Sequence, residues 1–262
     1  CKITLLSPDD EVIDEIIVPV SPRPGLSFGT DANDSTQRGW LPRATPLSQN
    51  GNIAETLLSP PLISFDTAFF DDKVILQLKN PEKNPQESVI RYTTDGSQPT
   101  EESPIAPESI ELTKTTVFKA STFAPKAIPS RVVTQTFINL GREVTLPIIS
   151  LSINDKFLYD EEIGIYTAGK DDNQYKNYEN DWHRPTTIEY FDTSGNSCIN
   201  QLGEIRIAGA TSRVHPMKSL IVYAKKRLGS EAFDYPFWKS KPEIEQVPSL
   251  LLRNAGNDFL YA

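Results

Sequence analysis

The sequence predicts a mainly β protein built from successive β-sandwich modules, and three observations support this fold class. Proline is abundant, at 21 residues against 13 glycines, and helix interiors tolerate proline poorly. Short apolar runs recur at spacings of roughly ten residues with turn signals between them, which is typical of β-sandwiches. Several of these runs also alternate with a period of two, as half-buried strands do.

Composition and charge limit the function classes. The chain has 262 residues, 38% of them hydrophobic, which fits one large domain or two to three small ones. Its net charge of -9 repels phosphate backbones, so we exclude nucleic acid as a general partner. No stretch is apolar over the roughly 20 residues that a membrane span needs. The acidic charge also suits an exported protein, although many cytosolic proteins are equally acidic.

The cysteines and histidines are too few for a disulfide scaffold or a zinc site, because the chain has only two of each. A Cys1–Cys198 bridge is an alternative, but we expect both thiols to be free. Cys1 is where a mature lipoprotein would begin, yet the strand-like run "KITLL" follows at once instead of a flexible tether. We therefore favour a chain cut from a longer polypeptide over a lipid anchor.

Residues 1–58 form the first predicted module. The run "KITLLSPDDEVIDEIIVPV" predicts a strand, an acidic turn and a second strand. The loop-rich stretch that follows contains Phe28 and Trp40 as expected anchors onto a sheet. The order of Asp14, "SFG" at 27–29, Trp40 and "ATPLSQN" resembles the closing part of a lamin-tail domain, although Leu47 replaces the usual glycine. The resemblance implies an Ig-like sandwich whose first strands precede this chain.

Residues 59–139 form the second predicted module. We expect two strands around a turn at Asp71–Asp72, a strand that runs into a tight turn at Asp95–Gly96, and three further strands up to residue 139. One of these strands shows period-2 alternation, with Val117, Lys119 and Ser121 against Phe118, Ala120 and Thr122. We expect Tyr92 and Phe118 to face the core. This pattern predicts an Ig-like β-sandwich.

The second module also resembles a known family. "YTTDGSQPT" and "IELTKTTVFKASTFAPKAIPSRVVTQTF" are similar to the chitobiase C-terminal domain, also called the Fn3-associated domain. The resemblance implies an Ig-like spacer that accompanies carbohydrate enzymes and surface proteins and has no catalytic residues of its own. Phe69, Phe70 and Phe123 could stack on a sugar, but we expect them in the core.

Residues 143–262 form the third predicted module. A buried strand in "VTLPIISLSIN" is followed by a short helix or turn, and further strands are expected at Ile163–Tyr166, 186–191, 202–208, "MKSLIVYAKK" and "SLLLRNAGNDF". Five ordered motifs resemble the start of the CotH spore-coat kinase-like family. They are "LPIISL", "GIY", "WHRPTTIEYFD", the stretch from Gly203 to Leu220, and "LRNAGND". The resemblance implies the β-rich N-terminal part of an α+β kinase-like domain, whose catalytic carboxylates lie further along the polypeptide.

The stretch "GEIRIAGATSRVHPMKSLIVYAKK" carries the candidate site residues. It is no Walker A loop, because Met217 rather than glycine precedes Lys218 and Pro216 lacks a backbone N–H. A protein-kinase-like geometry, with a small loop over the phosphates and a lysine on the next strand, would use Ser212, Arg213 and Lys218 to contact ATP. The alternative is a polar crossing between two strands, with Lys218 in solvent, and both interpretations stay open.

The remaining polar residues have simpler explanations. Arg206 alternates with isoleucines on a strand and is expected to face solvent or an ion-pair partner. His215 has no nearby metal-ligand partner in the sequence. Asn254, Asn257 and Asp258 could hold Mg²⁺, but a helix cap at Asn257 is favoured.

Two functions follow from these observations. In the first, the chain is part of a secreted or cell-surface bacterial protein, in which β modules lead into a CotH-like kinase domain whose catalytic part is absent here. ATP and Mg²⁺ would then bind only the longer protein, and we expect this chain alone to be inactive. The alternative is a noncatalytic adhesion or carbohydrate-associated protein, with protein or carbohydrate surface ligands. A glycoside hydrolase is ranked last because no carboxylate pair stands out.

Overall fold

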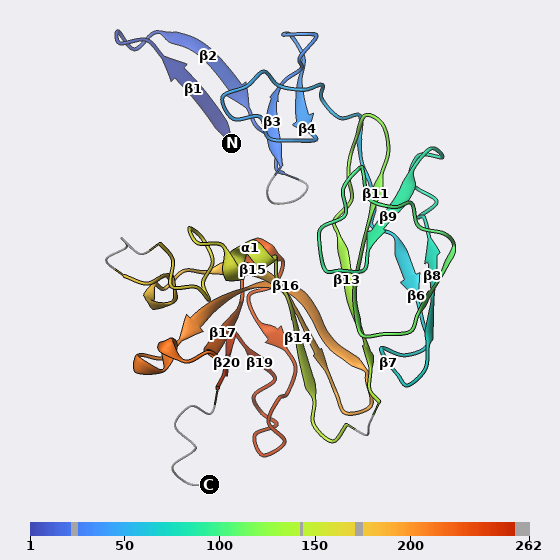
Figure 1. Cartoon of the computed structure of the whole chain (residues 1–262). Coiled ribbons are helices and arrows are strands. Elements are labelled where there is room, and N and C mark those ends of the chain that lie inside the picture. The colour runs from blue at the N-terminus through green and yellow to red at the C-terminus, as the bar shows by residue number, and fades with distance from the viewer. Residues whose placement is uncertain (22–25, 142–143, 171–174, 255–262) are drawn as a thin grey trace.

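The computed structural model describes residues 1–21, 26–141, 144–170 and 175–254. Along the chain follow a segment of short hairpins, a β-sandwich and a five-stranded sheet, which lie at the top, right and lower left of Figure 1. The mainly β fold class predicted from the sequence is confirmed. Within the described ranges, no helix is long and apolar enough to cross a membrane.

The N-terminal segment contains two β-hairpins that bury little apolar surface. The strands pair antiparallel as β1 (Lys2–Leu6) with β2 (Val12–Ile17) and β3 (Ser27–Thr30) with β4 (Arg38–Leu41). Arg38 links the two hairpins by donating to both carboxylate oxygens of Asp14 at 3.0 Å. Phe28 and Trp40 pack edge to face with ring centroids 5.1 Å apart. The expected first hairpin is present, but its apolar side chains are largely exposed, and Ile17 reaches 72%.

A very short strand connects this segment to the sandwich. Strand β5 (Thr56–Leu57) pairs in parallel with β12 (Ala127–Ile128). Neither strand was expected, because two residues are too few for a periodic pattern. Residues 56–57 therefore form a small sheet with β12, a strand of the second module.

The second module is a sandwich of two sheets. One sheet has the order β10-β8-β6 and contains β6 (Leu62–Ser64), β8 (Val74–Lys79) and β10 (Ser109–Leu112). The other has the order β7-β13-β11-β9 and contains β7 (Phe69–Phe70), β9 (Val89–Thr93), β11 (Thr116–Phe123) and β13 (Val133–Asn139). Phe118 and Phe137 are fully buried between the sheets, and Tyr92 stacks on Phe118 with ring centroids 5.6 Å apart. The core-facing orientation expected for Phe118 of β11 and Tyr92 of β9 is therefore confirmed.

The Asp71–Asp72 bend does more than the expected turn. Strands β7 and β8 flank the bend, but β7 pairs with β13 and β8 pairs with β6 and β10. The chain therefore crosses from one sheet to the other at this point, whereas a simple hairpin would have kept both strands in one sheet. At the next turn, Gly96 has φ +81° and Asp95 accepts the Ser97 N–H at 3.0 Å, as the Asp-Gly pair predicts.

The third module contains an antiparallel five-stranded sheet of order β14-β15-β16-β17-β20 and a separate two-stranded sheet, β18-β19. Its strands are β14 (Ile148–Ser152), β15 (Arg184–Phe191), β16 (Ser197–Ala208), β17 (Ser219–Ala224) and β20 (Ser249–Leu252). The shorter elements are α1 (Asp155–Tyr159), η1 (Asn177–Glu179), η2 (Thr211–Val214), η3 (Lys226–Leu228), β18 (Phe233–Asp234) and β19 (Gln246–Val247). The five strands of the large sheet agree with strands expected from the sequence. One further expected strand is absent.

The strand expected at Ile163–Tyr166 is absent, and that prediction was wrong. Ile165 donates its N–H to the Phe157 carbonyl oxygen at 2.9 Å, and Tyr166 donates to Leu158 at 2.8 Å. The segment therefore folds back onto α1 rather than joining a sheet. Ile165 is fully buried in the core under the five-stranded sheet, so its apolar character reflects core packing without a strand.

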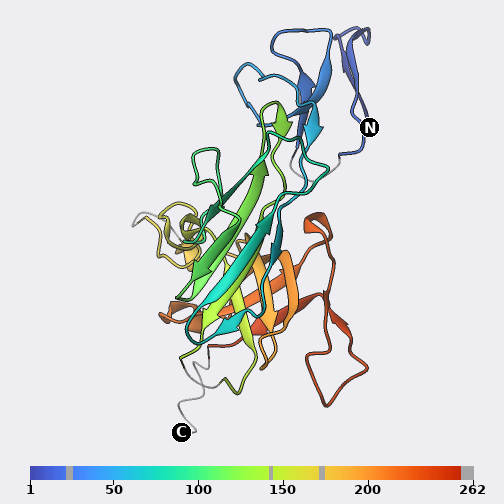
Figure 2. The same cartoon turned by 90° about the vertical axis from the view of Figure 1, so that its right-hand side faces the viewer.

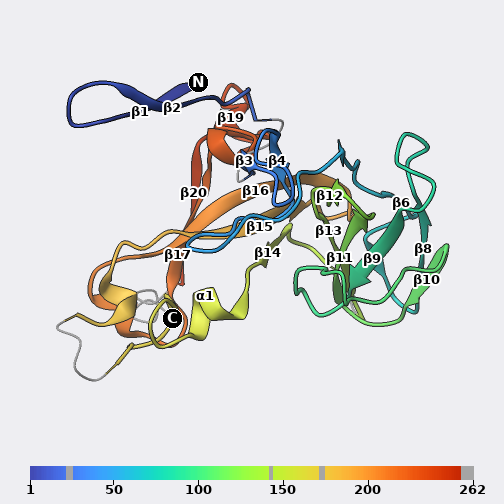
Figure 3. The ribbon, with the colours of Figure 1, turned by 90° about the horizontal axis from the view of Figure 1, so that it is seen from above.

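The sandwich and the five-stranded sheet share a buried interface. Figure 2 shows the green strands of the sandwich crossing in front of the orange strands, and in Figure 3 β13 lies beside β14 and β15. Phe69 packs against Phe191 with ring centroids 5.6 Å apart. The outer face of β11 and β13, which alternation alone would give to solvent, is covered here: Lys119 is only 2% exposed and Thr136 only 4%.

A buried carboxylate is the centre of this interface. Glu189 of β15 is fully buried; it accepts the Thr136 backbone N–H at 2.9 Å and also the Thr136 hydroxyl. Asn200 of β16 donates to the Thr134 carbonyl oxygen at 2.8 Å. Side chains of the third module therefore satisfy backbone groups along the edge of β13, which would otherwise be open to pairing with another chain.

Burial also changes the proton affinity of the charged groups at this interface. It raises the pKa of Glu189 to about 7, against the lowering effects of the Thr136 hydrogen bonds and the Lys119 charge. Burial lowers the pKa of Lys119, while the Glu189 and Asp95 charges oppose that change. The folded state therefore binds a proton on Glu189 more tightly than the unfolded chain does.

The first prediction concerns the pH dependence of stability. The stabilising contribution of the Glu189 proton is complete below about pH 4.5 and is lost as the pH rises through about 7. Since one pKa unit corresponds to about 1.4 kcal/mol, the full loss is about 3 kcal/mol. We expect Glu189→Gln to remove this slope in urea unfolding measured between about pH 5 and pH 8. The exposed control Glu108→Gln should keep it, and an unchanged slope in Glu189→Gln contradicts the prediction.

The second prediction concerns Gly195 in the β15–β16 turn. A Cβ at this position would lie 2.8 Å from Cγ of Phe69 in the sandwich, and φ is +83°. Gly96 has nearly the same φ, +81°, but a Cβ there would meet only Val117 at 3.8 Å. Both alanine variants are destabilised because alanine disfavours a positive φ. Gly195→Ala is destabilised by about a further 1–3 kcal/mol, because its Cβ clashes with Phe69. Chemical denaturation of the pair checks this, and equal destabilisation of the two variants would show that the contact is unimportant.

Candidate functional site

The site predicted from the sequence lies in the connection between β16 and β17. Strand β16 ends at Ala208, and Gly209 follows with φ +97°. A Cβ on Gly209 would lie 2.2 Å from the Ser212 hydroxyl oxygen, so only glycine fits this tight turn into η2. The connection thus brings Ser212, Arg213 and Lys218 into one compact loop at one end of the five-stranded sheet.

Arg213 is used fully within the protein. Its Nε donates to the Gly209 carbonyl oxygen at 2.6 Å, and Nη1 donates to the Glu179 carbonyl oxygen at 2.6 Å. Its Nη2 lies 2.9 Å from Asp181, which also accepts from Nη1 of Arg206 at 2.6 Å. The Arg213 hydrogen bond and the Arg206 charge lower the pKa of Asp181. Arg206 is therefore ion-paired, which is one of the two alternatives predicted for it.

Lys218 is buried rather than solvent-facing. It is 6% exposed, and its Nζ donates to the carbonyl oxygens of Arg213 and, at 3.0 Å, His215. The same Nζ lies 4.3 Å from the ring centroid of Tyr178 and 5.7 Å from that of Tyr166. Desolvation lowers the pKa of Lys218. The interpretation that places Lys218 in solvent is wrong, while its contact with phosphate stays a prediction.

The chemistry of the loop follows from these contacts. Two cationic side chains, Arg213 and Lys218, point at the protein's own carbonyl oxygens and aromatic rings, so they hold the loop closed. A phosphate would have to replace these partners in order to reach either cation. In this conformation the two cations stabilise the loop rather than an open binding site.

Sequence reasoning missed the partners of this loop. Tyr178 and Asp181 come from the stretch "YKNYENDW", where no periodic pattern indicates an element. Its only signal was a concentration of aromatic and amide residues, which a folded loop needs in order to pack and to satisfy its backbone. Tyr178 lies in the short helix η1, which contacts η2 directly.

Asn254 takes a structural role at the end of β20. It accepts from the Ser219 hydroxyl at 3.0 Å and donates to the Met217 carbonyl oxygen at 2.7 Å, which joins β20 to the loop. Asn257 and Asp258, considered for a cap or Mg²⁺, lie outside the described residues. In the part of the chain that the structure describes, no group of three or more His, Cys, Asp or Glu side chains could hold a metal ion. Cys1 and Cys198 are both free, as expected.

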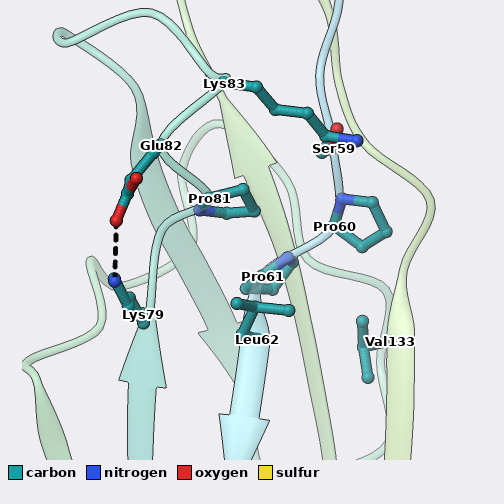
Figure 4. Close-up of a pocket in the computed structure, with 9 residues that line it drawn as sticks. All are labelled: Ser59, Pro60, Pro61, Leu62, Lys79, Pro81, Glu82, Lys83 and Val133. Carbon is teal, nitrogen blue, oxygen red and sulfur yellow. Dashed lines mark hydrogen bonds and ion pairs between the residues drawn. The ribbon is translucent and has the colours of Figure 1, made fainter.

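The sandwich has a groove, but Phe69, Phe70 and Phe123 do not form an exposed aromatic surface on which a sugar could stack. Phe69, Phe70 and Phe123 are 7%, 7% and 9% exposed, so the predicted core role is confirmed and sugar stacking by these rings is not supported. An open groove of about 590 Å³ lies on the sandwich. Its lining includes the rings of Pro60, Pro61 and Pro81, which Figure 4 shows. An ion pair of 3.0 Å between Lys79 and Glu82 lies at its rim.

Comparison with known proteins supports one of the three resemblances. A family model described as Fn3 associated matches residues 77–137, the range from β8 to β13. Searches of curated proteins and of solved structures find no match. The Fn3-associated identity of the sandwich is thus confirmed over these residues, whereas the lamin-tail and CotH-like resemblances stay predictions.

The third prediction tests the structural role of Lys218. Lys218→Met keeps an unbranched side chain but leaves the carbonyl oxygens of Arg213 and His215 without their buried donor, so we expect a loss of about 2 kcal/mol. The control Lys226→Met changes a side chain that is 87% exposed and should cost little. Hydrogen exchange should rise in residues 209–216 of Lys218→Met alone. Unchanged exchange there would rule out the role of Lys218 in closing the loop.

Proposed function

We propose that this chain is a noncatalytic, carbohydrate-associated part of a secreted or cell-surface protein. Its Fn3-associated sandwich acts as a spacer that holds the five-stranded sheet in a defined position. The observation that carries this proposal is the covered outer face of the sandwich, where Lys119 and Thr136 are buried against Glu189 of the next module. A spacer that only separated its neighbours would leave this face in water.

The Fn3-associated match covers the greater part of the sandwich. It supports the carbohydrate part of the proposal, because domains of this family accompany carbohydrate enzymes and surface proteins. Protein or carbohydrate ligands on a surface are the partners that we expect. The secreted or cell-surface location rests on the same resemblance. The proposal also includes a lamin-tail-like origin for residues 1–58, which rests on the sequence motifs of that segment.

A second candidate function is a nucleotide-binding lobe, as the CotH-like resemblance implies. One observation favours it: Ser212, Arg213 and Lys218 follow one another in the order of a kinase-like lobe, although Lys218 immediately precedes β17 rather than lying on it. ATP and Mg²⁺ would then be cofactors of the longer protein, and other residues would supply the catalytic carboxylates. We rank this candidate second because both cations are already used by backbone carbonyl oxygens.

The fourth prediction separates these two functions. We expect millimolar ATP with Mg²⁺ to leave the thermal midpoint of the chain unchanged, since binding would raise it by mass action. Titration of a fluorescent ATP analogue, with unlabelled ATP as competitor, provides a second readout that does not depend on stability. A rise in the midpoint that Arg213→Gln or Lys218→Met abolishes, together with competed binding of the analogue, would establish the nucleotide lobe instead.

A further inference from the structure

A second hollow lies beside the candidate loop, in the connection between α1 and β15. Its volume is about 400 Å³, within the range of small-molecule sites. Glu161, Glu162 and Lys170 line it from the segment after α1, and Tyr175, Asn180 and Trp182 line it from the segment before β15. The gold chain to the left of α1 in Figure 1 carries this region. We call it the α1–β15 pocket.

The walls of the α1–β15 pocket are fixed by internal hydrogen bonds. Asn177, which also lines it, is only 1% exposed and donates both amide hydrogens, to the Glu161 carbonyl oxygen at 2.9 Å and to the Thr167 hydroxyl at 3.2 Å. Asn180 donates to the Lys176 carbonyl oxygen at 3.3 Å. With its hydrogens used in this way, Asn177 can offer only its side-chain oxygen as an acceptor. The two halves of the pocket are therefore tied together before any ligand arrives.

The two aromatic rings of the pocket differ in availability. Trp182 packs against the core of the third module, and the Arg184 guanidinium lies 4.9 Å from its ring centroid. Tyr175 is 61% exposed. Tyr175 is therefore the ring with a face for a ligand, while Trp182 forms part of the wall.

The charges and polar groups of the pocket disfavour anionic and purely apolar ligands. Two carboxylates, Glu161 and Glu162, face one ammonium group, and Lys170 is paired with Glu162 at 2.5 Å. Phosphate and other anions are disfavoured by this balance. An apolar ligand would strand the carboxylate and amide oxygens without partners. A ligand with many hydroxyl donors and one flat apolar face satisfies both the oxygens and the ring.

We propose that the α1–β15 pocket binds a neutral saccharide, with Tyr175 stacked on one face of a sugar ring and the Glu161 and Asn180 oxygens accepting its hydroxyl hydrogens. This deepens the carbohydrate-associated function proposed above and rests on that function for the ligand class. The Fn3-associated match at 77–137 contributes no residue to the pocket. The carbohydrate contact would thus belong to the third module, with the sandwich as its support.

The test uses the whole chain and a panel of neutral oligosaccharides, among them β-glucans, xylo-oligosaccharides, manno-oligosaccharides and chito-oligosaccharides. The chain has three tryptophans, so Trp40→Phe with Trp238→Phe leaves Trp182 as the only tryptophan reporter. We expect at least one saccharide to change its fluorescence saturably. Tyr175→Ala should weaken binding roughly tenfold, the scale of one aromatic contact. Glu161→Gln tests the acceptor role and should weaken binding less.

The matched control is Tyr159→Ala, because Tyr159 is 61% exposed like Tyr175 but lies on α1 outside the pocket lining. Its binding should equal that of the parent chain. Saccharide binding that survives Tyr175→Ala would overturn the pocket while leaving the carbohydrate-associated function intact. Binding of amine-bearing saccharides alone, abolished by Glu161→Gln, would make the pocket a cation site and overturn the proposal. Absence of binding across the panel would also overturn it.

Discussion

The arrangement of this chain depends on one buried carboxylate placed across the open edge of a strand. Glu189 accepts both the backbone N–H and the hydroxyl of Thr136, and the neighbouring Asn200 serves the carbonyl oxygen of Thr134. These bonds give the edge of β13 the partners that another strand would have supplied. Burial of a charge is costly, so the interface is maintained only because hydrogen bonds and the nearby Lys119 compensate for it.

The sequence predicted the elements better than their surroundings. Alternation placed Phe118 on the core side of β11, but it could not reveal that Lys119 on the other side would also be buried, because a strand pattern does not show what covers its second face. The apolar Ile163–Tyr166 run resembled a strand, yet its backbone bonds return to α1. Periodicity alone does not distinguish a strand from an irregular segment that packs into a core.

The candidate site shows a similar limit. The sequence placed Ser212, Arg213 and Lys218 close together, and the structure agrees. It could not show that the partners of the two cations are carbonyl oxygens and the Tyr178 ring, because these come from residues 34 and 40 positions away or from the loop backbone itself. A basic residue in a motif therefore has two uses, binding a ligand or closing a loop, and only the contacts distinguish them.

The loop and the α1–β15 pocket share one wall. Arg213 donates to the Glu179 carbonyl oxygen, and the chain on either side of Glu179 supplies Asn177 and Asn180 to the pocket. The loop cations thus help to shape a neighbouring hollow instead of facing an open one. This arrangement links the two parts of the third module that carry its polar chemistry.

The parallel pairing of β5 with β12 has a mechanical consequence. Only two residues from each strand form this ladder, whereas the boundary on the other side of the sandwich combines a carboxylate clamp with packed phenylalanine rings. If the chain were pulled from its ends, the tension would part the N-terminal hairpins from the sandwich first. The sandwich and the five-stranded sheet would separate later, because the Glu189 hydrogen bonds and the Phe69–Phe191 contact hold their boundary.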